Sequence, residues 1–172
     1  YTADDIKDIH LLENLKTALE AITPADFTRY QKLLDLLKSK EYAWNPADSG
    51  DRVVIFTERI ETMKYLAERL RQDLGLKANA IQEISGGISD AEQQRIVEDF
   101  GRTESSVRVL VASDVASEGL NLHYLSHRLI HFDIPWSLMV FQQRNGRIDR
   151  YGQQKRPDIR YMLIESDNKR IK

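Results

Sequence analysis

Short apolar runs recur at intervals along the chain after residue 50. Val53–Phe56 is continuously apolar and mostly β-branched, a pattern typical of a strand buried in a parallel sheet. Comparable runs follow it, so we expect four further strands, at residues 80–84, 107–111, 129–132 and 159–164. The run at 80–84 is the weakest of them.

The stretches between these runs carry helical patterns. Apolar residues are spaced three or four apart over residues 63–74. Ser89 and Glu92 form a capping box, which predicts the start of a helix that continues to Phe100. Another helix is expected to begin at Pro135–Ser137 and to run as far as the arginines near residue 150. Alternating strands and helices predict an α/β fold, with a three-layer parallel sheet flanked by helices.

Residues 1–49 form a separate N-terminal helical segment in this interpretation. Helical spacing up to residue 22 is interrupted at 23–26, and a second helix follows through residue 37. Residues 45–51 are rich in turn-forming residues and read as a linker. We therefore divide the chain into a segment 1–49 and a compact domain 50–172, and we predict that 50–165 folds without 1–40.

Composition narrows the functional classes. The chain has 172 residues, no cysteine and a net charge of −2, so thiolate chemistry is excluded and no overall attraction to nucleic acid is expected. Its four histidines show no metal-ligand pattern, and we predict no metal site. The acidic start, which lacks Met, is not a signal peptide, and no apolar run is long enough to span a bilayer. We expect a cytoplasmic fragment of a longer protein, without membrane contact.

The arginines of residues 144–150 are the strongest functional signal. Arg144, Arg147 and Arg150 recur every third residue, and Gln143 precedes them. If the run is helical, Gln143, Arg147 and Arg150 share one stripe, with Arg144 off it. Planar guanidinium groups are suited to phosphoryl oxygens, so the stripe indicates a phosphate clamp. The alternative interpretation is a solvated helix face.

Small or polar residues follow the expected strands. They are Thr57, Ser85 with Gly86 and Gly87, Ser113 with Asp114, and Asp133. Ligands of parallel sheets bind outside the carboxyl ends of the strands, so these positions mark the expected binding edge. The polar loop after Ser113 contains Gly119, where backbone amides could approach a phosphate or a ribose.

Four ordered motifs resemble those of superfamily 2 helicases. Over residues 50–165 the chain resembles the C-terminal RecA-like lobe, with motif IV at 53–57, a glycine turn at 85–87, motif V at 109–122 and motif VI at 143–150. Residues 119–122, 132–136 and 152–153 are similar to Swi/Snf-type DNA translocases. The core 146–150 is similar to the bacterial RapA-like branch, in which DISARM-type phage-defence helicases are one candidate. Gln93 departs from the family, which usually has an arginine there.

The chain has no phosphate-loop lysine and no acidic Mg²⁺ box. The resemblance implies that these motifs belong to a missing N-terminal lobe, and that the two lobes together form the ATP site. It implies ATP with Mg²⁺ between two lobes, with Arg147 and Arg150 as arginine fingers and Gln143 orienting them or the attacking water. Gly119 and Asn121 would approach the nucleotide. Double-stranded DNA would cross the face that bears four residues, namely Thr57, Gly86, Gly87 and Ser113.

Two rival interpretations stay open at this point. The chain could be a Rossmann-like module that only docks nucleic acid or a partner, or a lobe of an RNA helicase. Trp136 is interpreted as an aromatic of the core or of the lobe interface. In the two-lobed interpretation the fragment alone is expected to be inactive.

Overall fold

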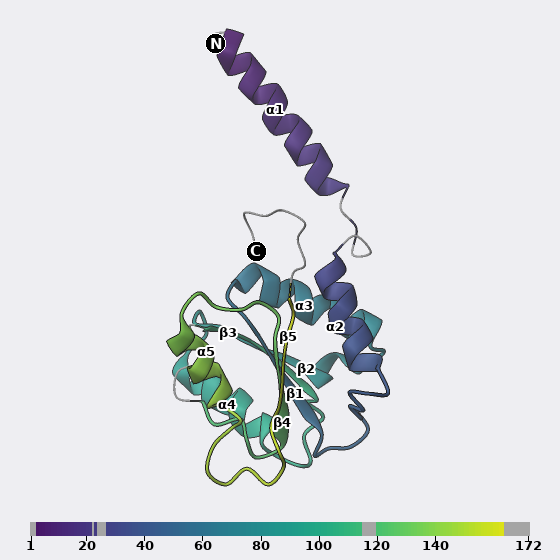
Figure 1. The fold of residues 1–172 in the computed structure, drawn as a ribbon, viewed down its shortest axis with the longest axis vertical. Coiled ribbons are helices and arrows are strands. Elements are labelled where there is room, and N and C mark those ends of the chain that lie inside the picture. The colour runs from purple at the N-terminus through teal and green to yellow at the C-terminus, as the bar shows by residue number, and fades with distance from the viewer. Residues whose placement is uncertain (1–2, 22, 24–26, 115–119, 164–172) are drawn as a thin grey trace.

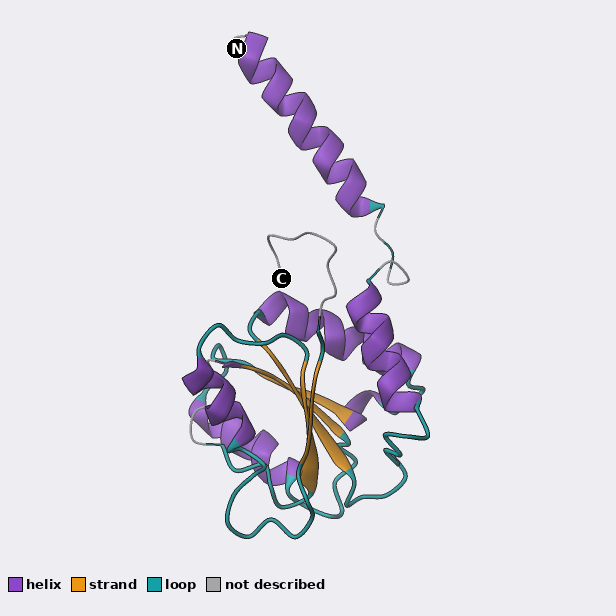
Figure 2. Ribbon diagram, in the orientation of Figure 1, coloured by secondary structure: helices purple, strands orange, loops and turns teal. Residues whose placement is uncertain are grey.

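The computed structural model describes residues 3–21, 23, 27–114 and 120–163. Within these residues, five parallel strands form one sheet in the order β2-β3-β1-β4-β5 (Figures 1 and 2). The strands are β1 (Arg52–Thr57), β2 (Ile81–Ile84), β3 (Val109–Ser113), β4 (Ser126–His131) and β5 (Asp158–Tyr161). The predicted three-layer α/β fold is confirmed, with strand ends shifted by one to three residues; Ile164 lies outside the described residues.

Helices cover both faces of the sheet. One face packs against α2 (Thr28–Lys38) and α3 (Ile60–Asp73), and the other against α4 (Asp90–Phe100). The other helical elements are α1 (Ala3–Glu20), α5 (Leu138–Asn145) and a 3₁₀ turn, η1 (Ala78–Ala80). Successive residues of β1 point to opposite faces. Val53 and Ile55 pack with α2 and α3, whereas Val54 and Phe56 pack with α4. The predicted start of α4 is confirmed, since Ser89 is its N-cap and accepts a hydrogen bond from the Glu92 amide.

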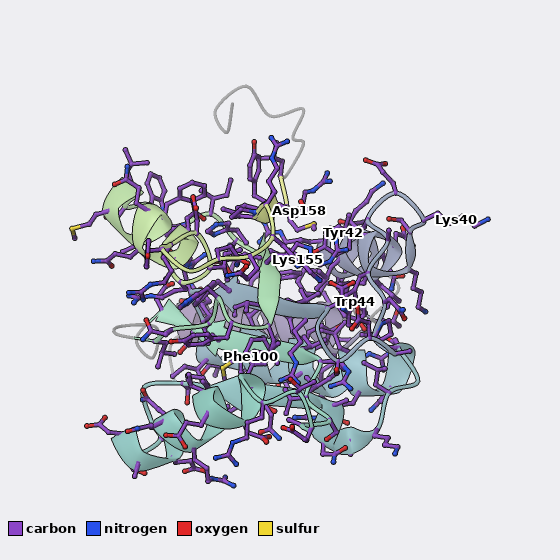
Figure 3. All side chains as sticks on the ribbon, turned by 90° about the horizontal axis from the view of Figure 1, so that it is seen from below. Lys40, Tyr42, Trp44, Phe100, Lys155 and Asp158 are labelled. Atoms are coloured by element: carbon purple, nitrogen blue, oxygen red, sulfur yellow. The ribbon has the colours of Figure 1, made fainter. Side chains whose placement is uncertain are left out.

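The second N-terminal helix belongs to the core of the sheet domain. Tyr30, Leu33 and Leu37 of α2 are buried in the cluster that contains Val53 and Ile55. The connection to β1 is held as well, because Trp44 Nε1 donates to the Asp51 carbonyl at 2.9 Å. The Trp44 side chain is labelled in Figure 3. From this packing we propose that the compact unit begins near residue 27, rather than at residue 50 as expected from the sequence.

The first helix is packed differently. Figure 1 shows α1 standing away from the sheet domain, and its apolar side chains Ile6, Ile9, Leu12 and Leu15 are each 43–65% exposed. The helical pattern of residues 3–20 was thus sufficient to predict the helix but not where it packs.

These two helices predict opposite results for truncation. Deleting residues 1–26 is expected to leave a cooperative thermal transition, because α1 covers none of the core described above. Deleting residues 1–40 is expected to abolish it, since burial of Tyr30, Leu33 and Leu37 contributes about 1.5–3 kcal/mol each, comparable in sum to the roughly 5–15 kcal/mol of a whole domain. Calorimetry of both truncated chains tests this. A transition that persists without 1–40 would restore the original boundary.

A buried arginine joins the centre of the sheet to the end of α4. Arg52 opens β1 and is fully buried, yet its guanidinium donates only to main-chain carbonyls, among them those of Asp99, Phe100 and Arg102. Burial lowers the pKa of Arg52 to about 10, so the group is still charged at neutral pH. A positive charge is favourable where the last carbonyls of a helix lack partners. Arg52 therefore acts as the C-terminal cap of α4.

Candidate functional site

One arginine of α5 connects the carboxyl ends of β3 and β4. Arg144 is fully buried, and its Nε and Nη2 donate to the two carboxylate oxygens of Asp114 at 2.5 and 2.8 Å. Its Nη1 donates to the Asp133 carbonyl at 2.9 Å, and the guanidinium lies 5.6 Å from the Phe56 ring centroid. This bidentate geometry is the strongest form of an arginine–carboxylate pair. Arg144 is therefore a structural ion-pair centre.

Asp133 extends this network to the end of β1. Its carboxylate accepts from the Thr57 hydroxyl at 2.5 Å and from the Glu58 amide at 3.0 Å. Its Oδ1 also lies 3.4 Å from Arg144 Nη2. Three strand ends that are distant in sequence are thus fixed relative to one another. Thr57 itself is fully buried, with its hydroxyl engaged inside the protein.

His131 lies beside Arg144 at the end of β4. Its Nε2 is 2.8 Å from the Asn145 side-chain oxygen, its Nδ1 is 3.3 Å from Arg144 Nη1, and its ring stacks on Phe141 at 4.5 Å. The residue is fully buried. Burial, together with the positive charge of Arg144, lowers the pKa of His131 below its ordinary value although the Asn145 contact opposes this. The imidazole is therefore neutral at pH 7.

The expected arginine stripe on one helix is wrong. Helix α5 ends at Asn145, with Gly146 as its C-cap, and residues 146–150 form turns. Gln143 is exposed on the last turn of α5, Arg147 is half-buried in the turn that follows, and Arg150 is exposed beyond it. The helical spacing of the arginines continues past Gly146, so the spacing alone did not predict that the helix stops at Asn145.

The turn after α5 is nevertheless held against the last residues of motif V. Arg150 Nη1 donates to the Asn121 side-chain oxygen, and the Leu122 amide donates to the Arg147 carbonyl at 3.1 Å. Gln153 Nε2 donates to the carbonyls of Ile148 and Ser126 at 3.0 and 2.9 Å. The structure thus brings together Arg150 and Asn121, two residues that the sequence assigned to one nucleotide site.

The residues predicted to contact nucleic acid divide into two groups. Gly86 and Gly87 are exposed in the turn after β2, at the expected edge of the sheet. Thr57 and Ser113 are fully buried and do not present their hydroxyls at the surface. Gly119 lies outside the described residues. No group of three candidate metal ligands occurs in the part of the chain that the structure describes.

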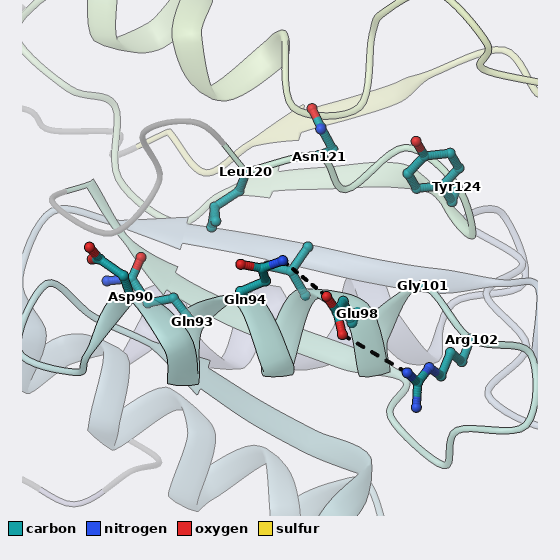
Figure 4. Close-up of a pocket in the computed structure, with 10 residues that line it drawn as sticks. Asp90, Gln93, Gln94, Glu98, Gly101, Arg102, Leu120, Asn121 and Tyr124 are labelled. Carbon is teal, nitrogen blue, oxygen red and sulfur yellow. Dashed lines mark hydrogen bonds and ion pairs between the residues drawn. The ribbon is translucent and has the colours of Figure 1, made fainter.

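A groove of about 750 Å³ runs between α4 and the segment 120–124 (Figure 4). Val97 and Leu120 supply its apolar lining, and Asn121 borders it. Gln94 donates to Glu98 at 3.1 Å, and Glu98 pairs with Arg102 at 3.9 Å along one wall. The groove therefore adjoins the Arg150–Asn121 contact but is lined mainly by α4.

Two features escaped the sequence interpretation. Trp136 is fully exposed, so the interpretation as a core residue is wrong, and Leu138 and Met139 beside it are also exposed. Arg144 was taken to lie away from the functional stripe, whereas it organises the network. The useful signal was the presence of acidic residues, Asp114 and Asp133, directly after two buried strands, since a buried cation needs such partners. Among the described residues, no helix is long and apolar enough to cross a membrane.

Comparison with known proteins defines the class. Residues 28–152 match the helicase conserved C-terminal domain, and the chain belongs to that family. More particularly, it is a superfamily 2 C-terminal lobe similar to RNA polymerase-associated protein RapA. It is 29% identical to RapA of Vibrio campbellii over 144 residues, and 30% identical to RapA of Vibrio vulnificus over 119 residues. These alignments cover 84% and 69% of this chain but only 14% and 12% of the relatives.

Solved structures agree on the fold. The C-terminal part of the Fun30 ATPase domain superposes with a TM-score of 0.65 at 20% identity, covering 91% of this chain and 49% of that one. The Escherichia coli DEAD-box protein SrmB, solved with RraA, superposes with a TM-score of 0.58 at 26% identity, covering 77% and 68%. The RecA-like fold and the helicase resemblance drawn from the motifs are confirmed.

Proposed function

We propose that this chain is the C-terminal lobe of a cytoplasmic, ATP-dependent translocase that moves along double-stranded DNA. Members of the family generally use ATP with Mg²⁺. The observation that carries the proposal is the contact between Arg150 and Asn121, because it places a motif VI cation and a motif V amide at one exposed point. Arg147 lies in the same turn.

The residues present fit a nucleotide shared between two lobes. Arg150 is exposed, and the Asn121 side chain to which it donates is a neutral amide. This contact does not neutralise the guanidinium, so its charge is available to phosphoryl oxygens. Asp114 and Asp133, in contrast, already neutralise Arg144. When bound, ATP with Mg²⁺ would supply the phosphoryl group that is transferred and a cation that neutralises part of its negative charge. Arg147 and Arg150 would bind the γ-phosphoryl oxygens, and Gln143 would orient these arginines or the attacking water. Gly119 and Asn121 would approach the ribose and the phosphates.

The nucleic-acid track is proposed along the exposed edge of the sheet. Gly86 and Gly87 can present backbone amides to phosphates without reading sequence. Trp136 adds a fully exposed aromatic ring, of the kind that contacts nucleotides by stacking. Thr57 and Ser113 would support the track from beneath. The Mss116p domain 2, whose solved structure is bound to an RNA duplex, superposes with a TM-score of 0.61 and favours RNA as the second candidate.

The 172-residue chain alone is expected not to hydrolyse ATP, since it contains neither a phosphate-loop lysine nor an acidic Mg²⁺ box. The two-lobed protein is expected to hydrolyse ATP and to be stimulated by duplex DNA. Steady-state hydrolysis is measured for both proteins without nucleic acid, with duplex DNA and with duplex RNA. Stimulation by RNA alone would favour an RNA helicase. DNA binding without hydrolysis in the two-lobed protein would identify a docking module, and turnover by the chain alone would refute the shared site.

A further inference from the structure

The buried imidazole of His131 connects two consecutive residues at the end of α5. With Nε2–H donating to the Asn145 side-chain oxygen, Nδ1 is the acceptor for Arg144 Nη1. One neutral tautomer therefore satisfies both contacts. Stacking on Phe141 one turn earlier fixes the plane of the ring. No solvent reaches the residue, so neither contact can be replaced by water.

The same two residues carry the turn that leads to the exposed arginines. The Arg144 carbonyl accepts from the Arg147 amide at 3.1 Å. The Asn145 carbonyl accepts from the amides of Ile148 and Asp149 at 3.2 and 2.9 Å. The direction in which the chain leaves α5 thus depends on how Arg144 and Asn145 are held, and His131 contacts the side chains of both.

We propose that His131 is a positioning residue for Arg147 and Arg150, acting through Arg144 and Asn145. This inference rests on the proposed function, because it assigns His131 a role in placing the proposed arginine fingers. The imidazole does not approach the nucleotide itself. Its contribution is to fix the start of the turn, where an error of about 1 Å in the position of a reacting group can cost on the order of 10²-fold in rate.

The contacts of His131 also make the turn after α5 depend on pH, because they require a neutral imidazole. The charged groups that face His131 are Arg144 from α5, Asp114 after β3 and Asp133 after β4, while Phe56 of β1 and Tyr161 of β5 are its strand neighbours. Protonation would place a second N–H against the Arg144 guanidinium and convert an accepting contact into a repulsive one. Because burial lowers the pKa of His131, this change occurs below the ordinary histidine range.

The test uses two variants at His131 and one control in the two-lobed protein, measured beside Arg150→Ala. His131→Phe keeps the ring stacking and removes both hydrogen bonds, whereas His131→Gln retains a donor and an acceptor but cannot be protonated. His10→Gln, at an exposed position of α1, is the matched control. ATP hydrolysis is measured between pH 5 and 8 with DNA present. We expect His131→Phe to lower kcat by about 10²-fold with KM for ATP changed less than about twofold. His131→Gln should keep most of kcat and lose the acidic fall in rate.

The outcomes separate this inference from the proposed function. If Arg150→Ala lowers kcat but His131→Phe does not, His131 has no positioning role. An acidic fall that persists unchanged in His131→Gln also overturns the inference. If Arg150→Ala hydrolyses ATP normally, it is the proposed function that fails. Thermal melting checks that His131→Phe is folded. If it is not, Asn145→Leu removes the same hydrogen bond from a half-buried position and is measured in its place.

Discussion

Arg150→Ala in the two-lobed protein is expected to lower the kcat of DNA-stimulated ATP hydrolysis by about 10³–10⁵-fold, the effect of losing an arginine finger. Charge spreads over the γ-phosphoryl oxygens in the transition state, and a guanidinium placed there stabilises it more than the ground state. The loss should therefore appear equally in kcat and kcat/KM. Single-turnover hydrolysis separates this step from ATP binding. Arg147→Ala is expected to behave in the same way.

Two further variants serve as controls for Arg150→Ala. Arg150→Lys should rescue poorly, because an ammonium cannot reproduce the planar pair of donors. Arg95→Ala removes an exposed arginine of α4, whose nearest carboxylate is Glu92 at 3.9 Å, and should leave the rate unchanged. Normal hydrolysis combined with weakened DNA binding in Arg150→Ala would show that this arginine is a DNA clamp, and the finger assignment would then be wrong.

Arg144→Leu is expected to destabilise the lobe by about 3 kcal/mol, measured as the free energy of unfolding in urea. Removing one partner of a buried ion pair typically costs about 3–5 kcal/mol, because the remaining charge lacks its counter-ion. The lower figure applies here since the side chains of Asp114 and Asp133 are 23% and 19% exposed and can be partly solvated. Arg144 itself is fully buried, so its loss also leaves a cavity at the end of the sheet.

The matched control is again an arginine on the surface. Arg102 pairs with Glu98 at 3.9 Å, and both side chains are more than half exposed, so Arg102→Ala should change the free energy of unfolding by less than about 1 kcal/mol. The spacing of the arginines alone placed Arg144 off the functional stripe and gave no sign of this structural role. Equal small effects from Arg144→Leu and Arg102→Ala would show that the buried pair contributes nothing to stability.

The strands could be predicted because their signal is local. Val53–Phe56 and residues 109–111 are apolar without interruption, which a parallel strand covered on both faces requires. The start of α4 was equally local, since Ser89 and Glu92 are three residues apart. Burial of α2 was not predictable in this way. Its apolar face is typical of any amphipathic helix, and only the fold shows that Tyr30 and Leu33 meet Val53.

The candidate site was also predictable only where its signal is local. The residue types of motif VI pointed to phosphate chemistry, and the structure places Arg150 beside Asn121. The separate role of Arg144 depends on Asp114, 30 residues earlier, and on Asp133, 11 residues earlier. Periodicity compares positions along one helix and carries no information about such distant partners. It therefore set Arg144 apart from the other two arginines but could not show that the fold buries Arg144 and exposes Arg150.

The Arg144 network has a mechanical consequence. The ends of β1, β3 and β4 and the last turn of α5 are tied through Thr57, Asp114, Asp133 and Arg144. These hydrogen bonds connect the four segments directly, without passing along the intervening backbone. Their relative positions at the carboxyl end of the sheet are therefore fixed by side chains as well as by strand pairing.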